Sequence, residues 1–171
     1  YLSLSWPLVG QSLLHILMQQ IDLMMVAQIG TVSVASVGLV NAYFFVFFMF
    51  FIALGFGVFS LMTQLHGGSK LEALGKLTGS ALSVSFIVGI LLWIVFIKGL
   101  DIFLVLWNVE SSVVEVSTLY AEGLGPGLPF LACIIVLESA LRSYGLTSEE
   151  FRLKIVATLV NILLNFILIF G

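Results

Sequence analysis

A run of 21 residues without a charged side chain, Leu77–Ile97, lies between Lys76 and Lys98. An α-helix needs about 20 apolar residues to cross the hydrocarbon core of a bilayer, so this run predicts a transmembrane helix. Composition extends the argument to the whole chain, because 61% of the 171 residues are hydrophobic and 9% are charged, whereas soluble domains carry about 25% charged residues. The runs lack the two-residue alternation of barrel strands. The sequence therefore predicts an all-α polytopic membrane protein.

Five apolar segments are predicted to cross the membrane, over residues 6–27, 34–64, 77–97, 116–141 and 155–171. Pro126 and Pro129 lack a backbone N–H and are expected to kink the fourth helix. Residues 100–107 form a short amphipathic link that is expected to lie along the membrane interface, where Trp107 would be favoured. The chain starts without Met and stops directly after an apolar run. We therefore expect it to be part of a longer protein.

Basic residues indicate the orientation, because short cytoplasmic loops are enriched in Lys and Arg. Five of the six lie in the connections after the second and fourth helices: Lys70, Lys76, Arg142, Arg152 and Lys154. We therefore expect a cytoplasmic N-terminus in the inner (plasma) membrane of the cell. The charges form no basic patch, which argues against nucleic acid as a partner. No Ser-His, His-Glu-x-x-His or paired-Asp constellation occurs within the helices, so neither an enzymatic activity nor a cofactor is predicted.

Asp22 is the main candidate functional residue, because it is the only charged residue between Leu2 and Ser69. An ionised side chain inside a bilayer costs at least about 2.5–3.5 kcal/mol, so such a carboxylate is by default a functional-site hypothesis. At about 100° per residue, one stripe of the first helix carries five side chains: Gln11, His15, Met18, Asp22 and Met25. Gln11 and His15 are candidates for lining a cavity; hydrogen bonds between helices are the alternative for both.

The fifth predicted helix carries Asn161 and Asn165, which are four residues apart and therefore on one face. Hard cations such as Na⁺ prefer oxygen ligands, which Asn amides and a carboxylate supply, and a desolvated carboxylate without a cation takes up a proton. Asp22 with the two amides thus predicts a pocket for Na⁺ or a proton, and two amides that only join helices are the alternative. Tyr43 is a further candidate for lining a cavity, through cation–π contacts, although a Phe-rich helix also suits packing.

Other residues have structural interpretations. Glu138 and Arg142 are four residues apart and predict an ion pair. Glu149 and Glu150 are expected to start a helix, whose positive end favours carboxylates. Two pairs of small residues at four-residue spacing predict close helix contacts: Gly75 with Gly79, and Gly123 with Gly127.

The order of several short motifs along the chain is informative. Pro7 stands fifteen residues before Asp22, within a first helix that ends in the run Ile21–Gly30. The run Arg142–Thr147 then precedes Asn161-x3-Asn165-x5-Gly171. With this order and helix placement the chain resembles the amino-terminal half of a MATE-family (multidrug and toxin extrusion) transporter. The resemblance covers essentially all 171 residues and implies helices one to five of a twelve-helix fold, with the sixth helix and the carboxy-terminal lobe absent. Asn165, in place of the Asp of many members, matches the NorM-like pattern.

The resemblance implies an antiporter that exchanges external Na⁺ or H⁺ for organic cations, including drugs, by alternating access. It implies that Asp22, Asn161 and Asn165 form the cation site, and that Pro7 bends the first helix as the cation binds. A proline that merely starts the helix is the alternative for Pro7. The partners implied are the organic cations, the coupling ion, the lipid bilayer and the missing parts of the same protein.

Two other functions fit the composition. A flippase for lipid-linked oligosaccharides has a related architecture, but it would be expected to show a more cationic central cavity than Asp22 and His15 suggest. A non-transporting membrane scaffold would leave the carboxylate of Asp22 unexplained.

Overall fold

The computed structural model describes residues 2–68 and 71–170, and within them every regular element is a helix. In chain order the elements are α1 (Leu2–Ala27), α2 (Thr31–Gly67), α3 (Leu71–Leu106), α4 (Ser111–Leu124), the 3-10 turn η1 (Gly125–Gly127), α5 (Leu128–Ser143) and α6 (Thr147–Phe170). Three stretches of the described residues are long and apolar enough to cross a membrane: Thr31–Gly67, Glu72–Leu106 and Ser111–Ser143. The all-α fold class is confirmed.

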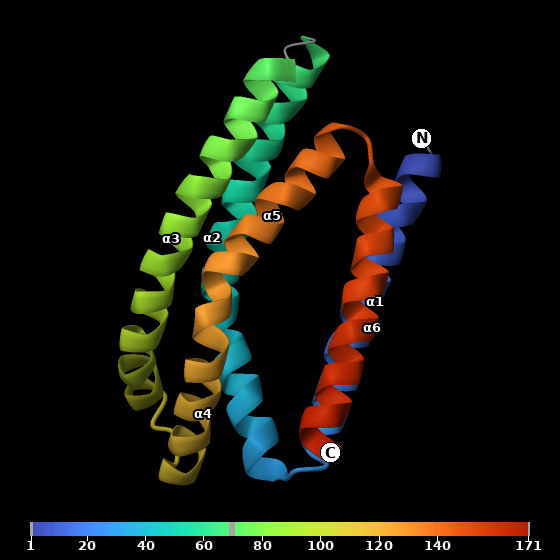
Figure 1. The fold of residues 1–171 in the computed structure, drawn as a ribbon. Coiled ribbons are helices and arrows are strands. Elements are labelled where there is room, and N and C mark those ends of the chain that lie inside the picture. Colours follow the sequence, from blue (N-terminus) through green and yellow to red (C-terminus); the bar gives the residue numbers. More distant parts are fainter. Residues whose placement is uncertain (1, 69–70, 171) are drawn as a thin grey trace.

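The helices form two groups. α1 and α6 lie side by side and run in the same direction, while α2, α3, α4 and α5 pack together (Figure 1). The start of α1, the end of α2, the start of α3 and the α5–α6 connection lie at one end of the molecule (Figure 1). Lys76 of α3 and the basic residues of α5 and α6 therefore share an end with the start of α1, as the loop charges predict; Lys70 lies outside the described residues. That this end is cytoplasmic stays a prediction.

Large apolar side chains fill the α2–α5 group. Its core includes Phe47 and Phe51 of α2 and Phe96, Leu100 and Leu104 of α3. The predicted interfacial link over residues 100–107 is wrong, because α3 continues to Leu106. Leu100 and Leu104 follow Phe96 at four-residue intervals and are each only 2% exposed, so they extend one buried face of the same helix.

Helices extend beyond the apolar windows that predicted them. α1 begins at Leu2 and α6 at Thr147, whereas the sequence placed their starts near residues 6 and 155. The apolar window marks where a helix is most hydrophobic, but the backbone hydrogen bonds continue into the neighbouring polar residues, such as the serines before Trp6 and the charged residues at the start of α6. Pro7 consequently lies inside α1 and is buried.

The predicted kink between residues 116 and 141 is present as η1, which separates α4 from α5. Pro126 lies in this turn, and Pro129 lies in the first turn of α5. α3 approaches α5 closely here, because a Cβ built at Gly89 would lie 2.5 Å from the Cα of Pro129.

The glycines that allow close packing are not the predicted ones. A Cβ built at any of four glycines would meet no described atom within 4 Å: Gly75, Gly79, Gly123 and Gly127. Close approaches occur instead at Gly89, at Gly55 against Ile135, and at Gly10 against the ring of Phe151. The prediction from four-residue spacing is therefore wrong within the part of the chain that the structure describes.

Candidate functional site

Asp22 of α1 and Asn165 of α6 meet across the interface between these helices. Nδ2 of Asn165 donates a hydrogen bond to Oδ1 of Asp22 at 2.8 Å and lies 3.1 Å from Oδ1 of Asn161. All three side chains are half-buried. The structure thus brings together the three residues that the sequence singled out. Asp22 and Asn165 are 143 positions apart in the chain, so their proximity results from the pairing of α1 with α6.

The chemistry of this cluster is that of an oxygen-donor site. An ionised Asp accepts hydrogen bonds or binds cations through both oxygens, and each Asn side chain offers one carbonyl oxygen. Rotation of the Asn165 amide by half a turn would direct its Oδ1 toward the carboxylate. The described residues contain no group of three His, Cys, Asp or Glu side chains that could hold a metal ion. One carboxylate with amide oxygens suits a hard cation such as Na⁺ better than a transition metal.

The predicted polar stripe of α1 has two other members near its start. Gln11 is buried, and its Nε2 lies 3.5 Å from the backbone carbonyl oxygen of Thr147 at the start of α6. His15 is exposed, and its Nε2 lies 3.3 Å from Nε2 of Gln19 one turn later. Gln11 therefore makes an interhelical contact, as one of the two interpretations of the sequence expected.

Gln11 and His15 also line a cavity of about 420 Å³ between α1, α2, α5 and α6. The α2 wall is mostly apolar and contains Phe48, Ile52, Gly55, Phe56 and Phe59. The polar wall contains Gln11, Ser12, His15, Glu138, Ser139, Arg142 and Lys154. A cavity of this size with an apolar wall and few polar groups is typical of sites for small organic molecules.

Tyr43 is placed elsewhere, in the core between α2 and α3. Its ring centroid lies 4.7 Å from that of Phe103 and 5.2 Å from that of Phe96. Its hydroxyl donates a hydrogen bond to the carbonyl oxygen of Phe96 at 3.2 Å. Tyr43 does not line the cavity described above, whose aromatic residues are Phe48, Phe56 and Phe59 of α2; it packs because its ring and its hydroxyl both find partners on α3. That Tyr43 lines a cavity of the whole protein stays a prediction.

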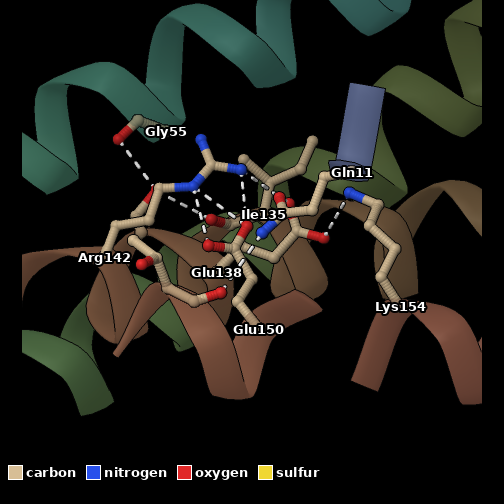
Figure 2. A network of polar contacts seen from close by, with 9 residues as sticks. Gln11, Gly55, Ile135, Glu138, Arg142, Glu150 and Lys154 are labelled. Atoms are coloured by element: carbon tan, nitrogen blue, oxygen red, sulfur yellow. Dashed lines mark hydrogen bonds and ion pairs between the residues drawn. The ribbon is translucent and has the colours of Figure 1, made fainter. Parts of the chain in front are cut away.

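An ion-pair network joins the end of α5 to the start of α6 (Figure 2). Arg142 donates from Nε to both carboxylate oxygens of Glu150, at 2.9 and 3.0 Å, and from Nη2 to Oε1 at 2.6 Å. Glu138 lies 3.6 Å from Arg142, as its spacing predicts, but it is closer to Lys154, at 3.1 Å. Glu150 is only 2% exposed. It is therefore a buried partner of Arg142, in addition to lying in the first turn of its helix.

A protein family model and several curated proteins match this chain. The MatE family model matches residues 7–167. The chain belongs to the MatE family. Similar curated proteins are the "Probable multidrug resistance protein YoeA" of Bacillus subtilis, 32% identical over 96% of this chain, and the "Uncharacterized transporter YisQ" of the same species, 25% identical over 99%. The "Multidrug resistance protein PmpM" of Pseudomonas aeruginosa is 26% identical over 99% of the chain.

This MatE chain spans 36–37% of the length of these relatives. No solved structure gives a significant match to it. The matched range of the MatE model contains Pro7, Asp22, Asn161 and Asn165, so the whole candidate site lies within the family domain.

Sequence reasoning missed Glu150 as a buried partner in this MatE domain, although a signal was present. Four polar residues of α6 fall on one stripe about 60° wide at about 100° per residue: Glu150, Lys154, Asn161 and Asn165. The stripe turns one side of α6 toward α5 at its start and toward α1 further along.

Proposed function

We propose that this chain is the amino-terminal part of a cation-coupled multidrug efflux antiporter. In this proposal, inward movement of Na⁺ or H⁺ drives the export of organic cations by alternating access. The names of two relatives, both multidrug resistance proteins, support drug export. The activity is that of the whole protein, since the chain covers 36–37% of its relatives.

The contact between Asp22 and Asn165 is the observation that carries this proposal. A carboxylate among apolar helices is costly unless it has a partner, and here the partner is a neutral amide at 2.8 Å rather than a basic side chain. A hydrogen bond to an amide leaves the negative charge of Asp22 uncompensated. A monovalent cation or a proton would neutralise it, with Asn161 and Asn165 as further ligands or hydrogen-bond partners.

The same contact suggests how binding changes the conformation. For Asn165 to offer its Oδ1 to a cation held by Asp22, its amide would have to turn, and turning breaks the hydrogen bond from Nδ2 to Oδ1 of Asp22. Pro7 lies in α1 on the cytoplasmic side of this point in our orientation, where the helix lacks one backbone hydrogen bond and bends most easily. Coupling requires that the ion bind one of the two conformations more tightly, because an ion with equal affinity for both shifts nothing.

The charges along the cavity favour cationic substrates over an anionic lipid-linked sugar. Arg142 and Lys154 are both paired, with Glu150 and Glu138 respectively. The polar wall therefore has no excess of positive charge for a phosphate group, which a flippase of related architecture would need.

The test uses the full-length protein in inverted membrane vesicles and follows ethidium transport under an imposed Na⁺ or pH gradient. Asp22→Asn keeps the size of the side chain and removes its charge, and we expect transport to lose its dependence on the ion gradient. Asp101→Asn is the matched control, because Asp101 is exposed on α3 and undergoes the same chemical change. Equal gradient-driven transport by Asp22→Asn and wild type would refute the proposal.

A further inference from the structure

Polar contacts hold the start of α6 on two sides (Figure 2). Arg142 of α5 binds Glu150 through both carboxylate oxygens, and Glu138 of α5 binds Lys154 one turn later. On the α1 side, Gln11 contacts the first residue of α6 through its backbone carbonyl. All these contacts fall within the first eight residues of the helix.

Beyond its first eight residues α6 packs along α1, and its polar contacts there are those of the candidate cation site itself. Its outward face carries exposed apolar side chains, among them Leu153, Val156, Leu159 and Leu163. Apolar side chains gain equally from lipid and from another apolar helix face, so they do not favour one axial position strongly. The ion pairs at the start of α6 are therefore the contacts best suited to set its register.

Register matters for the candidate cation site. A slip of one residue moves a helix by about 1.5 Å and turns it by about 100°. The hydrogen bond from Asn165 to Asp22 is 2.8 Å long, and such bonds are limited to about 2.7–3.2 Å. Asn161 follows Glu150 by eleven residues, which is about three turns, so both lie on the same side of α6.

A buried ion pair contributes little net stability compared with apolar packing, and its best-attested use is to specify register. Glu150 is 2% exposed and Arg142 supplies three donor contacts to it. This pairing restricts direction as well as distance, because the planar guanidinium meets both carboxylate oxygens.

We propose that the Arg142–Glu150 pair is a positioning device for the cation site: it fixes the start of α6 against α5 and thereby sets where Asn161 and Asn165 meet Asp22. The proposal rests on the cation-site function given above. Arg142 and Glu150 are positioning residues in this account, since neither touches the site itself.

The first test measures the concentration of Na⁺ that half-saturates efflux by the full-length protein, or of H⁺ if the wild type is driven by protons. Glu150→Gln should raise it by about tenfold, the low end of the effect of removing residues that orient metal ligands. The half-saturating ion concentration is the readout rather than the maximal rate, because Arg142 lines the cavity and loses its charged partner in this variant. A residue needed only for stability would lower the amount of folded protein and leave the half-saturating concentration unchanged.

Glu149→Gln is the matched control. Glu149 is the adjacent residue and undergoes the same change of charge, but it is exposed and pairs with the exposed Arg152 at 2.9 Å. We expect wild-type ion affinity from this variant. An equal loss of affinity in both variants would indicate a general charge effect and would overturn the proposal.

A double-variant comparison tests whether Glu150 acts through Asn165. If it does, Glu150→Gln should have a smaller effect on ion affinity when Asn165 is already replaced by Ala than in the wild type, because only Asn161 is then left to position and effects of coupled residues do not add. Independent, additive losses would overturn the proposal.

A direct measure of register needs no transport. In a full-length variant with Cys133→Ser, Asp22→Cys and Asn165→Cys, a short bifunctional thiol reagent should join the two introduced thiols rapidly, and Glu150→Gln should slow the reaction. An unchanged rate would overturn the proposal.

Should Glu150→Gln fail to fold, Arg142→Lys decides in the same assay, because Lys keeps the charge but cannot contact both oxygens in the same plane. If transport by Asp22→Asn loses its dependence on the ion gradient but Glu150→Gln leaves the half-saturating ion concentration unchanged, the positioning role is refuted. The proposed cation site is not affected by that result.

Discussion

Gly89→Ala should destabilise the protein, although alanine is the better helix former. Gly89 lies on the face of α3 that packs on the start of α5. A Cβ at this position would lie 2.5 Å from the Cα of Pro129, 3.1 Å from its nitrogen and 3.3 Å from the carbonyl oxygen of Leu128. All three atoms belong to the backbone, so no change of side-chain rotamer relieves the clash.

The magnitude follows from the movement that the methyl group would force. Carbon atoms pack best at about 3.5–4.0 Å, so α3 and α5 would have to separate by roughly 1 Å at this point, and a gap of that size forfeits about a quarter to a half of each contact energy. Leu128 and Pro129 are both buried and have little room to move. Overpacking of this kind costs about 1–3 kcal/mol, and the backbone contact places Gly89→Ala toward the upper end.

Gly79→Ala is the matched control on the same helix, because a Cβ there would meet no described atom within 4 Å. Replacing Gly by Ala inside a helix gains about 0.8–1 kcal/mol at either position. This gain cancels when the two variants are compared, so their difference in the free energy of unfolding isolates the clash. We expect that difference to be about 3 kcal/mol, with Gly89→Ala the less stable.

The assay is reversible unfolding of the purified full-length protein in mixed micelles, with increasing dodecyl sulfate and tryptophan fluorescence as the signal. The free energies of unfolding of both variants and the wild type are compared at one detergent composition. Equal stability of the two variants, or a gain in Gly89→Ala, would show that α3 and α5 do not approach as described.

Two further variants test the packing and the ion-pair network in the same unfolding assay. Tyr43→Phe removes the hydrogen bond to the carbonyl oxygen of Phe96 and should lower the free energy of unfolding by about 0.5–1.5 kcal/mol. Gradient-driven efflux by this variant should keep its ion dependence. A loss of that dependence would contradict the core position of Tyr43. Arg142→Leu leaves the carboxylate of Glu150 buried without its main partner and should cost about 1–3 kcal/mol, less than for a fully buried pair because the Arg142 side chain is 37% exposed. Replacing both Arg142 and Glu150 by Leu should recover most of that loss, and a double variant as unstable as Arg142→Leu would refute the explanation.

The helices and the cation-site residues could be predicted from the sequence, because each corresponds to a strong local pattern. Asp22 stands out in an apolar stretch, and the four-residue spacing of Asn161 and Asn165 fixes their common face. Their meeting required knowledge that α1 pairs with α6, which no local pattern supplies. The resemblance to the MATE family provided that step.

Other features could not be predicted because they depend on which surfaces meet. Gly75 and Gly79 have the spacing of a packing motif, but a Cβ at either position would meet no described atom within 4 Å, whereas one at Gly89 would meet the backbone of α5. Leu100 and Leu104 were assigned to an interfacial link because the charge-free run ends before Lys98 and the residues that follow are amphipathic, and only their burial against the core shows that α3 continues. A carboxylate in a first helical turn is favourable anywhere, so the position of Glu150 alone did not indicate its partner; only the polar stripe that it shares with Lys154, Asn161 and Asn165 did.

The pairing of the first helix with the last has a consequence for synthesis in the cell. Asn165 is 143 residues downstream of Asp22, so the hydrogen bond between them forms only after nearly the whole described chain has left the ribosome. Chains emerge at about 5–20 residues per second, which leaves α1 for several seconds or more with a carboxylate that lacks this partner. During that interval the charge costs about 2.5–3.5 kcal/mol if it lies at the bilayer centre. α1 is therefore expected to enter the membrane late, protonated, or in the company of the insertion machinery.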